Sequence, residues 1–240
     1  MGAMSRECVL FSLGRVPYEK ALKSQRELLA RRCEGTLAKD CLLLLEHEPV
    51  FTLGRHARKG KILVTSEFLS KRSIEVRKVE RGGDITFHGP GQLVAYPIVD
   101  LGKASLSVKE FVNRLEEVMI RTAFDFGVDA ARRRGRPGIW VDRRKLGNVG
   151  IAVRHGVTFH GLSLNVRRDC LEPFGWIVPC GWEGTRMTSL ERISGEETSM
   201  SAVEDRMAVW FCRLFQWKLI SPKEVDYAVE QALLAQTSPA

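Results

Sequence analysis

The sequence predicts an α+β fold, a mixed α/β single domain in which a largely antiparallel sheet is flanked by helices. Two observations support this class. Helical and strand patterns mix along the chain without the strict alternation that parallel βαβ units produce. Late in the chain, apolar segments at 138–142, 145–153 and 157–166 follow one another across short polar turns, which is typical of an antiparallel meander.

The first half of the chain contains one helix and several strands. A short apolar strand is expected at 9–13, and a helix follows over 17–35, with a proline in its first turn and a glycine at its end. Segments 41–48 and 74–80 have strand composition. Segment 92–101 does too, and its internal proline predicts an edge strand or a bulge, because proline cannot donate to a sheet ladder.

Two helices are predicted to begin with capping boxes, in which a serine and a glutamate three residues later bond each other's backbone N–H groups. The clearer helix spans 107–125 and begins with Ser107 and Glu110. Its apolar residues recur at helical spacing on one face. The last helix is expected to begin at Ser201, with Glu204 completing the second capping box.

Length and composition limit the class of protein. We expect residues 1–4 to be a leader outside the fold and residues 5–240 to form a single domain. No stretch approaches the roughly eighteen apolar residues that a membrane span needs, and the N-terminus lacks signal-peptide order. The six cysteines form no Cys-x-x-Cys pair and no zinc-ligand spacing, so we expect free thiols, no metal and a cytoplasmic location.

Basic residues are concentrated in one segment. The net charge is +8, and segment 132–145 holds seven arginines and lysines against the single acidic residue Asp142. Such a run is often a solvated loop, but it also suits nucleic acid or an acidic protein partner. Nucleic acid is the weaker alternative, because no aromatic residue is interleaved among the arginines of 132–136.

A glycine-rich segment, Arg81 to Gln92, separates two predicted strands. Its glycines would let the backbone approach a ligand closely, although the signatures of phosphate-binding loops are absent. A glycine-rich turn is often only a turn. Arg81 and His88 favour a binding role, since a turn needs neither.

Cys180 is the candidate nucleophile. It lies between Pro179 and Gly181, in a bend that would expose a thiol rather than pack it. A nearby cation or histidine would activate such a thiol. Residue types and spacing leave three candidates open, namely Lys145, His88 and His160.

The strand that begins at Lys145 contains Gly147 and Gly150, and interior glycines there suggest close approach of an extended ligand. For Lys145 alone, an exposed strand end is the simpler interpretation. His160 lies in mid-strand among apolar residues and is interpreted as a hydrogen-bonded core histidine.

Together and in this order, the segments 81–101, 138–153, 156–166 and 173–190 resemble the lipoyl(octanoyl) transferases. This family, the octanoyl-[acyl-carrier-protein]:protein N-octanoyltransferases, is related to biotin and lipoate protein ligases. The resemblance implies a biotin/lipoate protein ligase-like fold. It also implies transfer of an octanoyl group to a lysine of lipoyl domains, the first step of endogenous lipoate attachment.

The resemblance also implies roles for particular residues. Cys180 matches the nucleophile that forms an acyl-enzyme thioester, and Lys145 matches the lysine that lowers its pKa. Asn148 departs from the small aliphatic residue usual in the family, which leaves the acyl-length range open. The residues that match the acyl-substrate pocket are Arg81, Gly82, Gly83, Asp84, Ile85, Thr86, Phe87, His88, Asn148, Val149, Gly150, Gly161, Leu162 and Ser163.

The implied partners are octanoyl-acyl-carrier protein as donor, and the lipoyl domains of 2-oxoacid dehydrogenases and the glycine cleavage H protein as acceptors. Neither nucleic acid nor membrane is implied, and a monomer is expected. The reaction needs no cofactor, ATP or metal, because a thioester is already activated. The alternatives are an ATP-dependent lipoate–protein ligase, a basic nucleic-acid-binding module and an inactive scaffold.

Overall fold

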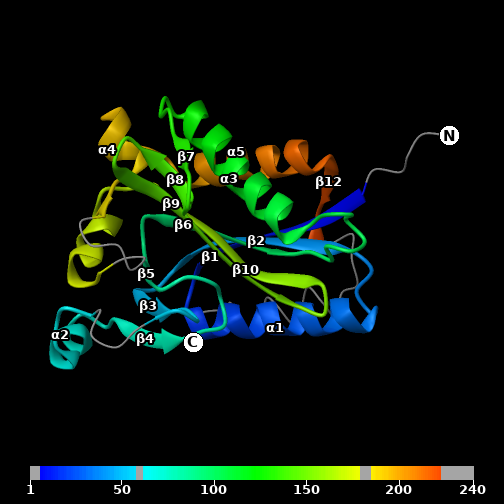
Figure 1. Ribbon diagram of the computed structural model, residues 1–240, viewed down its shortest axis with the longest axis horizontal. Coiled ribbons are helices and arrows are strands. Elements are labelled where there is room, and N and C mark those ends of the chain that lie inside the picture. The colour runs from blue at the N-terminus through cyan, green and yellow to red at the C-terminus, as the bar shows by residue number, and fades with distance from the viewer. Residues whose placement is uncertain (1–5, 58–61, 179–184, 223–240) are drawn as a thin grey trace.

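A large mixed sheet forms the centre of the computed structural model, which describes residues 6–57, 62–178 and 185–222 (Figure 1). Within the described residues this sheet has nine strands. In spatial order they are β12 (Trp217–Ile220), β1 (Arg6–Val16), β2 (Asp40–His47), β6 (Gln92–Ile98), β10 (Val157–Asn165), β9 (Arg144–Arg154), β8 (Arg136–Val141) and β7 (Ala131–Arg133), with β11 (Arg186–Met187) beside β9.

Most neighbouring strands of this sheet run antiparallel. From β2 through β6, β10, β9 and β8 to β7 each pair is antiparallel, whereas β1 is parallel to β2 and to β12. The predicted meander of β8, β9 and β10 is therefore confirmed. The predicted class, α+β around a largely antiparallel sheet, is confirmed as well.

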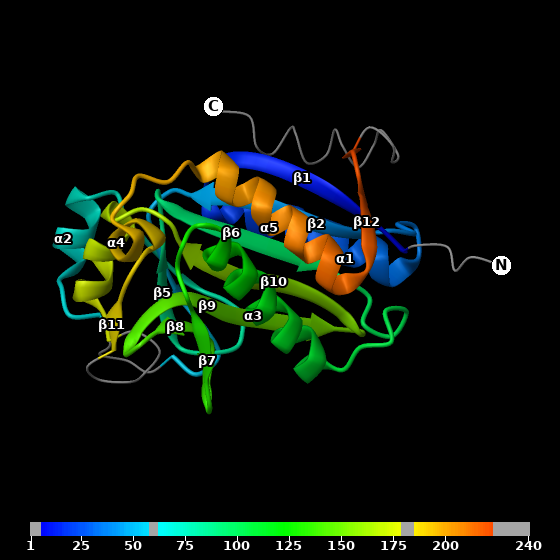
Figure 2. The same ribbon diagram turned by 90° about the horizontal axis from the view of Figure 1, so that it is seen from above.

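Helices cover both faces of the sheet. Helix α1 (Tyr18–Glu34) lies on one face, and α3 (Val108–Asp125) and α5 (Met200–Phe215) lie together on the other (Figures 1 and 2). The sheet therefore separates two hydrophobic clusters, one packed under α1 and one under α3 and α5. No helix among the described residues is both long enough and apolar enough to cross a bilayer.

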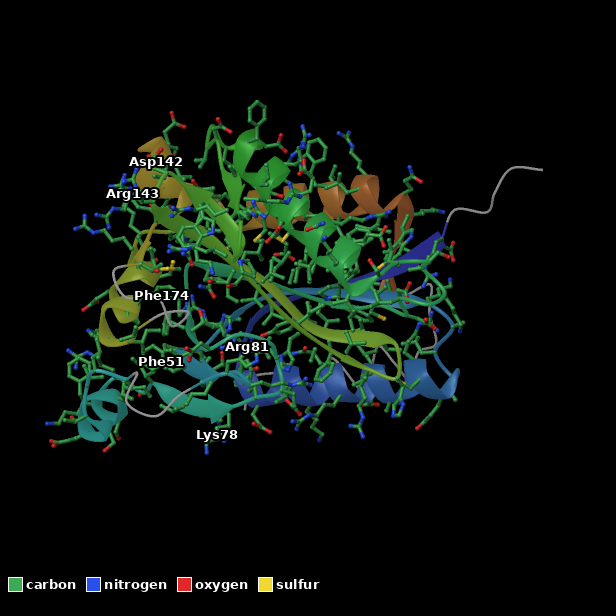
Figure 3. The ribbon with its side chains drawn as sticks, in the orientation of Figure 1. Phe51, Lys78, Arg81, Asp142, Arg143 and Phe174 are labelled. Atoms are coloured by element: carbon green, nitrogen blue, oxygen red, sulfur yellow. The ribbon has the colours of Figure 1, made fainter. Side chains whose placement is uncertain are left out.

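A second, three-stranded sheet was not predicted. It consists of β4 (Glu75–Lys78), β3 (Val50–Leu53) and β5 (Ile85–His88), and α2 (Ser66–Lys71) lies near it (Figure 1). It packs against the 3-10 helix η1 (Asp169–Trp176) through Phe87 of β5, whose ring contacts both Phe51 and Phe174. Figure 3 shows Phe51 and Phe174 on the same side of the molecule. A short helix α4 (Leu190–Ser194) follows β11.

The helix boundaries follow local signals in most cases. Helix α1 begins directly after Pro17 and ends at Gly35, whose φ of 79° is the left-handed geometry that favours glycine. The capping box of Ser107 and Glu110 is present at α3. At α5 the prediction is wrong, because the N-cap is Ser199 rather than Ser201; its hydroxyl accepts from the Ala202 N–H, and no capping box forms.

The edge position predicted from Pro97 is also wrong, since β6 lies between β2 and β10 in the middle of the sheet. The ladder with β10 is interrupted there, between the pairs Leu162–Ala95 and Asp100–Val157. The Thr158 hydroxyl fills part of the gap, because it donates to the Pro97 carbonyl at 2.7 Å and accepts from the Val99 N–H at 3.0 Å.

The arginine-rich run is a β-hairpin and not a solvated loop. Strands β7 and β8 pair across a turn at Gly135, which has φ 73°. Arg132 forms ion pairs with Glu116 and Glu117 of α3, at 3.1 Å and 2.9 Å. Part of this positive charge therefore holds the hairpin on α3.

Candidate active site

A cavity of about 470 Å³ lies where the large sheet faces the segment that precedes β5. Strands β9, β10 and β6 contribute one wall, and the glycine-rich segment contributes the opposite one. The lining residues are Tyr18, His56, Arg81, Gly82, Gly83, Asp84, Ile85, Thr86, His88, Tyr96, Val112, Pro137, Lys145, Asn148, Val149, Gly150, Ile151, His160, Gly161, Leu162 and Ser163.

Two paired glycines shape the wall formed by the sheet. Gly150 of β9 lies opposite Gly161 of β10 in the ladder. A Cβ at Gly150 would lie 3.2 Å from the Gly82 carbonyl oxygen, and one at Gly161 would overlap the Ala95 carbonyl oxygen. Because Gly150 has no side chain, the glycine-rich segment reaches the sheet, where the Gly82 N–H donates to the Ile151 carbonyl at 2.9 Å. The missing side chain at Gly161 instead lets β10 lie close to β6.

Arg81 holds the glycine-rich segment on the small sheet. Its guanidinium donates to the Thr52 carbonyl at 2.6 Å and to the Thr52 hydroxyl at 2.9 Å, and also to its neighbour Gly82 at 3.0 Å. The side chain lies between the two sheets (Figure 3). Only 7% of the residue is exposed. Arg81 thus both lines the cavity and fixes the position of the glycines that follow it.

Buried rings gather at one end of the cavity. His47 Nδ1 donates to the Val16 carbonyl at 2.8 Å, so Nε2 accepts from the Tyr96 hydroxyl at 2.8 Å. Tyr18 stacks on His88, with ring centroids 6.4 Å apart. Burial lowers the pKa of His47 to about 4 and that of His88 well below its ordinary value. Both rings are therefore neutral at pH 7, and this end of the cavity carries no imidazolium charge.

A chain of hydrogen bonds connects His88 to the strand that carries Lys145. His88 Nδ1 lies 2.7 Å from Gln92 Oε1, and the Gln92 amide donates to Asn165 at 2.8 Å. Asn165 in turn donates to the Thr188 carbonyl at 2.9 Å, and the Thr188 N–H donates to the Lys145 carbonyl at 2.9 Å. Each member is buried, so the chain fixes both walls of the cavity relative to each other.

His160 is buried, as predicted, but its ring is not hydrogen-bonded. Its backbone has φ 55°, and its N–H donates to the Gln25 side chain at 2.8 Å. Neither ring nitrogen has a hydrogen-bond partner, and the nearest carboxylate, that of Glu80, is 3.7 Å away. Burial lowers the pKa of His160 to about 4, although Glu80 acts in the opposite direction.

Lys145 lines the cavity from β9 and is only 3% exposed, so the interpretation as an exposed strand end is wrong. Its neighbour in the lining is Asn148, whose amide donates to the Ser163 hydroxyl at 3.5 Å. Strand β11 pairs Met187 with Lys145. The segment that ends at β11 is the one that contains Cys180.

Cys180 itself lies outside the described residues. Burial raises the pKa of each of the five cysteines that the structure describes, which makes all of them poor thiolates at pH 7. These are Cys8, Cys33, Cys41, Cys170 and Cys212.

The other residues predicted for the pocket line the cavity, with one exception. Phe87 is absent from the lining and packs edge-on against Phe51 and Phe174. Among the lining residues that the sequence analysis missed are Tyr18 and Tyr96. In the sequence each is only a tyrosine in a predicted helix or strand. Tyrosines in such positions are too common to identify a site.

The catalytic-domain model of lipoyl protein ligases A and B matches residues 17–212, a range that contains the whole cavity lining. The chain belongs to this lipoyl protein ligase A/B family. Two curated relatives are named octanoyltransferase. The one from Desulfotalea psychrophila is 46% identical over 208 residues, which cover 86% of this chain and 93% of the relative. The one from Caldicellulosiruptor bescii is 47% identical over 205 residues, covering 85% and 89%.

Solved structures of ligases share the fold of this family member. Lipoate-protein ligase A bound with ATP superposes with TM-score 0.71 at 13% identity, covering 98% of this chain and 94% of that one. A bi-partite lipoate protein ligase from Thermoplasma acidophilum gives 0.71 at 14%, covering 97% and 92%. Biotin protein ligase from Aquifex aeolicus, with biotin and ATP, gives 0.53 at 13%, covering 87% and 70%. The predicted biotin/lipoate protein ligase-like fold is confirmed.

Proposed function

We propose that this protein is an octanoyltransferase that moves an octanoyl group from acyl-carrier protein to a lysine of lipoyl domains, through a thioester on Cys180. The observation that carries the proposal is the buried Lys145, which lines the cavity beside the strand that follows the Cys180 segment. The relatives named octanoyltransferase, which match most of the chain, support the same reaction.

In the first step the Cys180 thiolate attacks the carbonyl carbon of the donor thioester. The new C–S bond forms as the bond to the carrier's thiol breaks, and that thiol leaves with a proton. In the second step the amine of the acceptor lysine attacks the Cys180 thioester, loses a proton and forms an amide, so the Cys180 thiol is regenerated. Lys145 favours the thiolate by its charge and relays the protons. The oxyanion would be stabilised by backbone N–H groups.

The acyl tail is proposed to extend along β9 and β10. An extended eight-carbon chain is about 9 Å long, given C–C bonds of about 1.5 Å. Three strand residues cover about the same length at about 3.3 Å each, so a tail that starts at Lys145 would reach Asn148. Burial of each methylene contributes about 0.8 kcal/mol, so the tail would contribute several kcal/mol. The contacts would come from residues 81–86, His88, and the segments 148–150 and 161–163.

Basic residues near Lys145 are proposed to bind the acidic carrier protein. Because Arg132 is paired with two glutamates, the exposed Arg134 and Arg143 are better placed for this than Arg132. Figure 3 shows Arg143 at the periphery, beside Asp142 in the turn between β8 and β9. Charge complementarity of this kind increases the association rate and is weakened by salt.

We also place the reaction in the cytoplasm, since a free Cys180 thiol needs a reducing compartment. We expect a monomer to suffice, because one chain carries both Lys145 and the cavity. The proposed acceptors are the lipoyl domains of 2-oxoacid dehydrogenases and the glycine cleavage H protein.

The decisive experiment is intact-mass spectrometry after incubation with octanoyl-acyl-carrier protein. We expect one octanoyl group per chain, mapped to Cys180 and absent from Cys180→Ser. Cys33→Ser, which removes an exposed thiol of α1, is the matched control and should be acylated as the wild type is. An adduct on Cys170 would contradict the site. Loading of a lipoyl domain by Cys180→Ser with ATP and free octanoate would indicate a ligase instead.

A further inference from the structure

Trp140 of β8 lies against Lys145. The two residues face each other in the β8–β9 ladder, and Lys145 Nζ lies 5.4 Å from the centroid of the indole ring. The indole is 2% exposed, and its Nε1 donates to the Arg136 carbonyl at 3.2 Å. The ring is therefore fixed by both packing and a hydrogen bond, at a distance typical of a cation–π contact.

Two arginines contact the same ring from the hairpin side. The guanidinium carbon of Arg133 lies 5.1 Å from the centroid and that of Arg136 lies 6.0 Å from it. Both side chains are partly buried. The three cations around this indole repel one another because their charges are alike. The arrangement is stable only if the attraction of each cation to the ring, together with its contacts to its own strand, offsets that repulsion.

A glycine opens the space for the lysine side chain. Gly138 has φ 103°, and a Cβ there would lie 2.9 Å from Lys145 Cε and overlap the Gly147 carbonyl oxygen. The Gly138 N–H donates at 2.7 Å to Glu116 of α3, a residue that is 6% exposed. Helix α3 therefore fixes the strand that carries both the glycine and the indole.

We propose that Trp140 is a positioning residue for Lys145. The indole face attracts the ammonium group and the gap at Gly138 admits the stem, so Lys145 Nζ is held at the cavity and away from solvent. An aliphatic residue such as leucine would keep the position apolar but would not attract the cation, because it lacks the negative face of an aromatic ring. This inference rests on the proposed function, since it acts through the role of Lys145.

The test measures steady-state transfer from octanoyl-acyl-carrier protein to a lipoyl domain. Trp140→Leu should lower kcat about tenfold, which is the effect of losing a desolvated cation–π contact, with KM changed much less. Trp140→Phe keeps an aromatic face and should retain most of the rate. Because it is the smaller change, it still tests the inference if the leucine variant does not fold. Trp210→Leu is the matched control, because Trp210 of α5 contacts Arg213 at 5.1 Å and does not line the cavity.

A double-mutant cycle separates positioning from general damage. If Trp140 acts through Lys145, then Trp140→Leu has no further effect on kcat in a Lys145→Met background. Additive losses, or equal losses in Trp140→Phe and Trp140→Leu, would overturn the inference. If Lys145→Met alone keeps the full rate, the proposed role of Lys145 fails instead. If the wild type forms no Cys180 adduct, the proposed function fails.

Discussion

Lowering the pH from 7.5 to 5 should destabilise this fold through two histidines buried around the cavity. Burial lowers the pKa of His47 and that of His160 to about 4, against an ordinary value of 6.5. The unfolded chain therefore binds more protons than the folded one between pH 6.5 and 4. Stability is complete above pH 6.5 and is lost as the pH falls through this window.

The magnitude follows from linkage. For a folded pKa of about 4 and an unfolded pKa of about 6.5, one histidine loses about 2 kcal/mol of stability between pH 7.5 and 5. His47 and His160 together lose about 4 kcal/mol, a large part of the 5–15 kcal/mol typical of a domain. His88 acts in the same direction, because burial lowers its pKa too. At pH 5 carboxylates with ordinary pKa values remain ionised, so they add little to this change.

The assay is urea denaturation followed by circular dichroism at several pH values between 7.5 and 5. His47→Gln should be less stable at pH 7.5 but should lose about 2 kcal/mol less stability than the wild type on acidification, since one titrating ring is gone. His155→Gln removes an exposed imidazole and is the matched control. An unfolding free energy that is flat across this range, or a slope that His47→Gln leaves unchanged, would refute the reasoning.

Three further predictions concern stability, each measured by chemical denaturation. Gly161→Ala should cost about 2 kcal/mol or more by forcing two central strands apart, whereas Gly175→Ala, where a Cβ meets nothing within 4 Å, should cost little. Asp40→Asn should cost about 3 kcal/mol, because the buried guanidinium of Arg32 loses its carboxylate at 3.1 Å and keeps only that of Asp100 at 3.8 Å, and Arg6 loses its partner as well; a loss under 1 kcal/mol would contradict this. Ser107→Ala should cost about 1 kcal/mol by removing the cap of α3, and no change would show that the cap contributes nothing.

The parts of the fold that depend on local chemistry could be predicted from the sequence. Helix α3 begins where Ser107 and Glu110 cap each other, and α1 ends where Gly35 takes a left-handed backbone. The position of β6 depends on a distant residue instead. Thr158 supplies the hydrogen bonds missing around Pro97, so a strand that contains proline can lie in the middle of the sheet. A prediction made from the proline alone could not foresee these hydrogen bonds, because Thr158 is distant from Pro97 in the sequence.

The candidate site, too, could be predicted from the sequence only in part. The glycines of 81–92 and the strand beginning at Lys145 indicated a ligand, and both segments line the cavity. The left-handed backbone of His160 and its unpaired ring could not be predicted, because a histidine in mid-strand is usually extended and bonded. Phe87 was assigned with its neighbours, although its side chain packs in the cluster under the small sheet.

The paired glycines of β9 and β10 have a consequence for redesign of the substrate range. At Gly150 and Gly161 one wall of the cavity consists of backbone without side chains. A Cβ added at Gly161 would collide with the backbone of β6. Other lining residues, such as Tyr18 and Ile85, contribute side chains from outside the large sheet. Both are buried in smaller hydrophobic clusters, so a mutant library that keeps the glycines and exchanges these two residues only for other apolar ones would change the room for the acyl chain while leaving the central ladder intact. The size of the cavity can thus be varied from the side that the large sheet does not form.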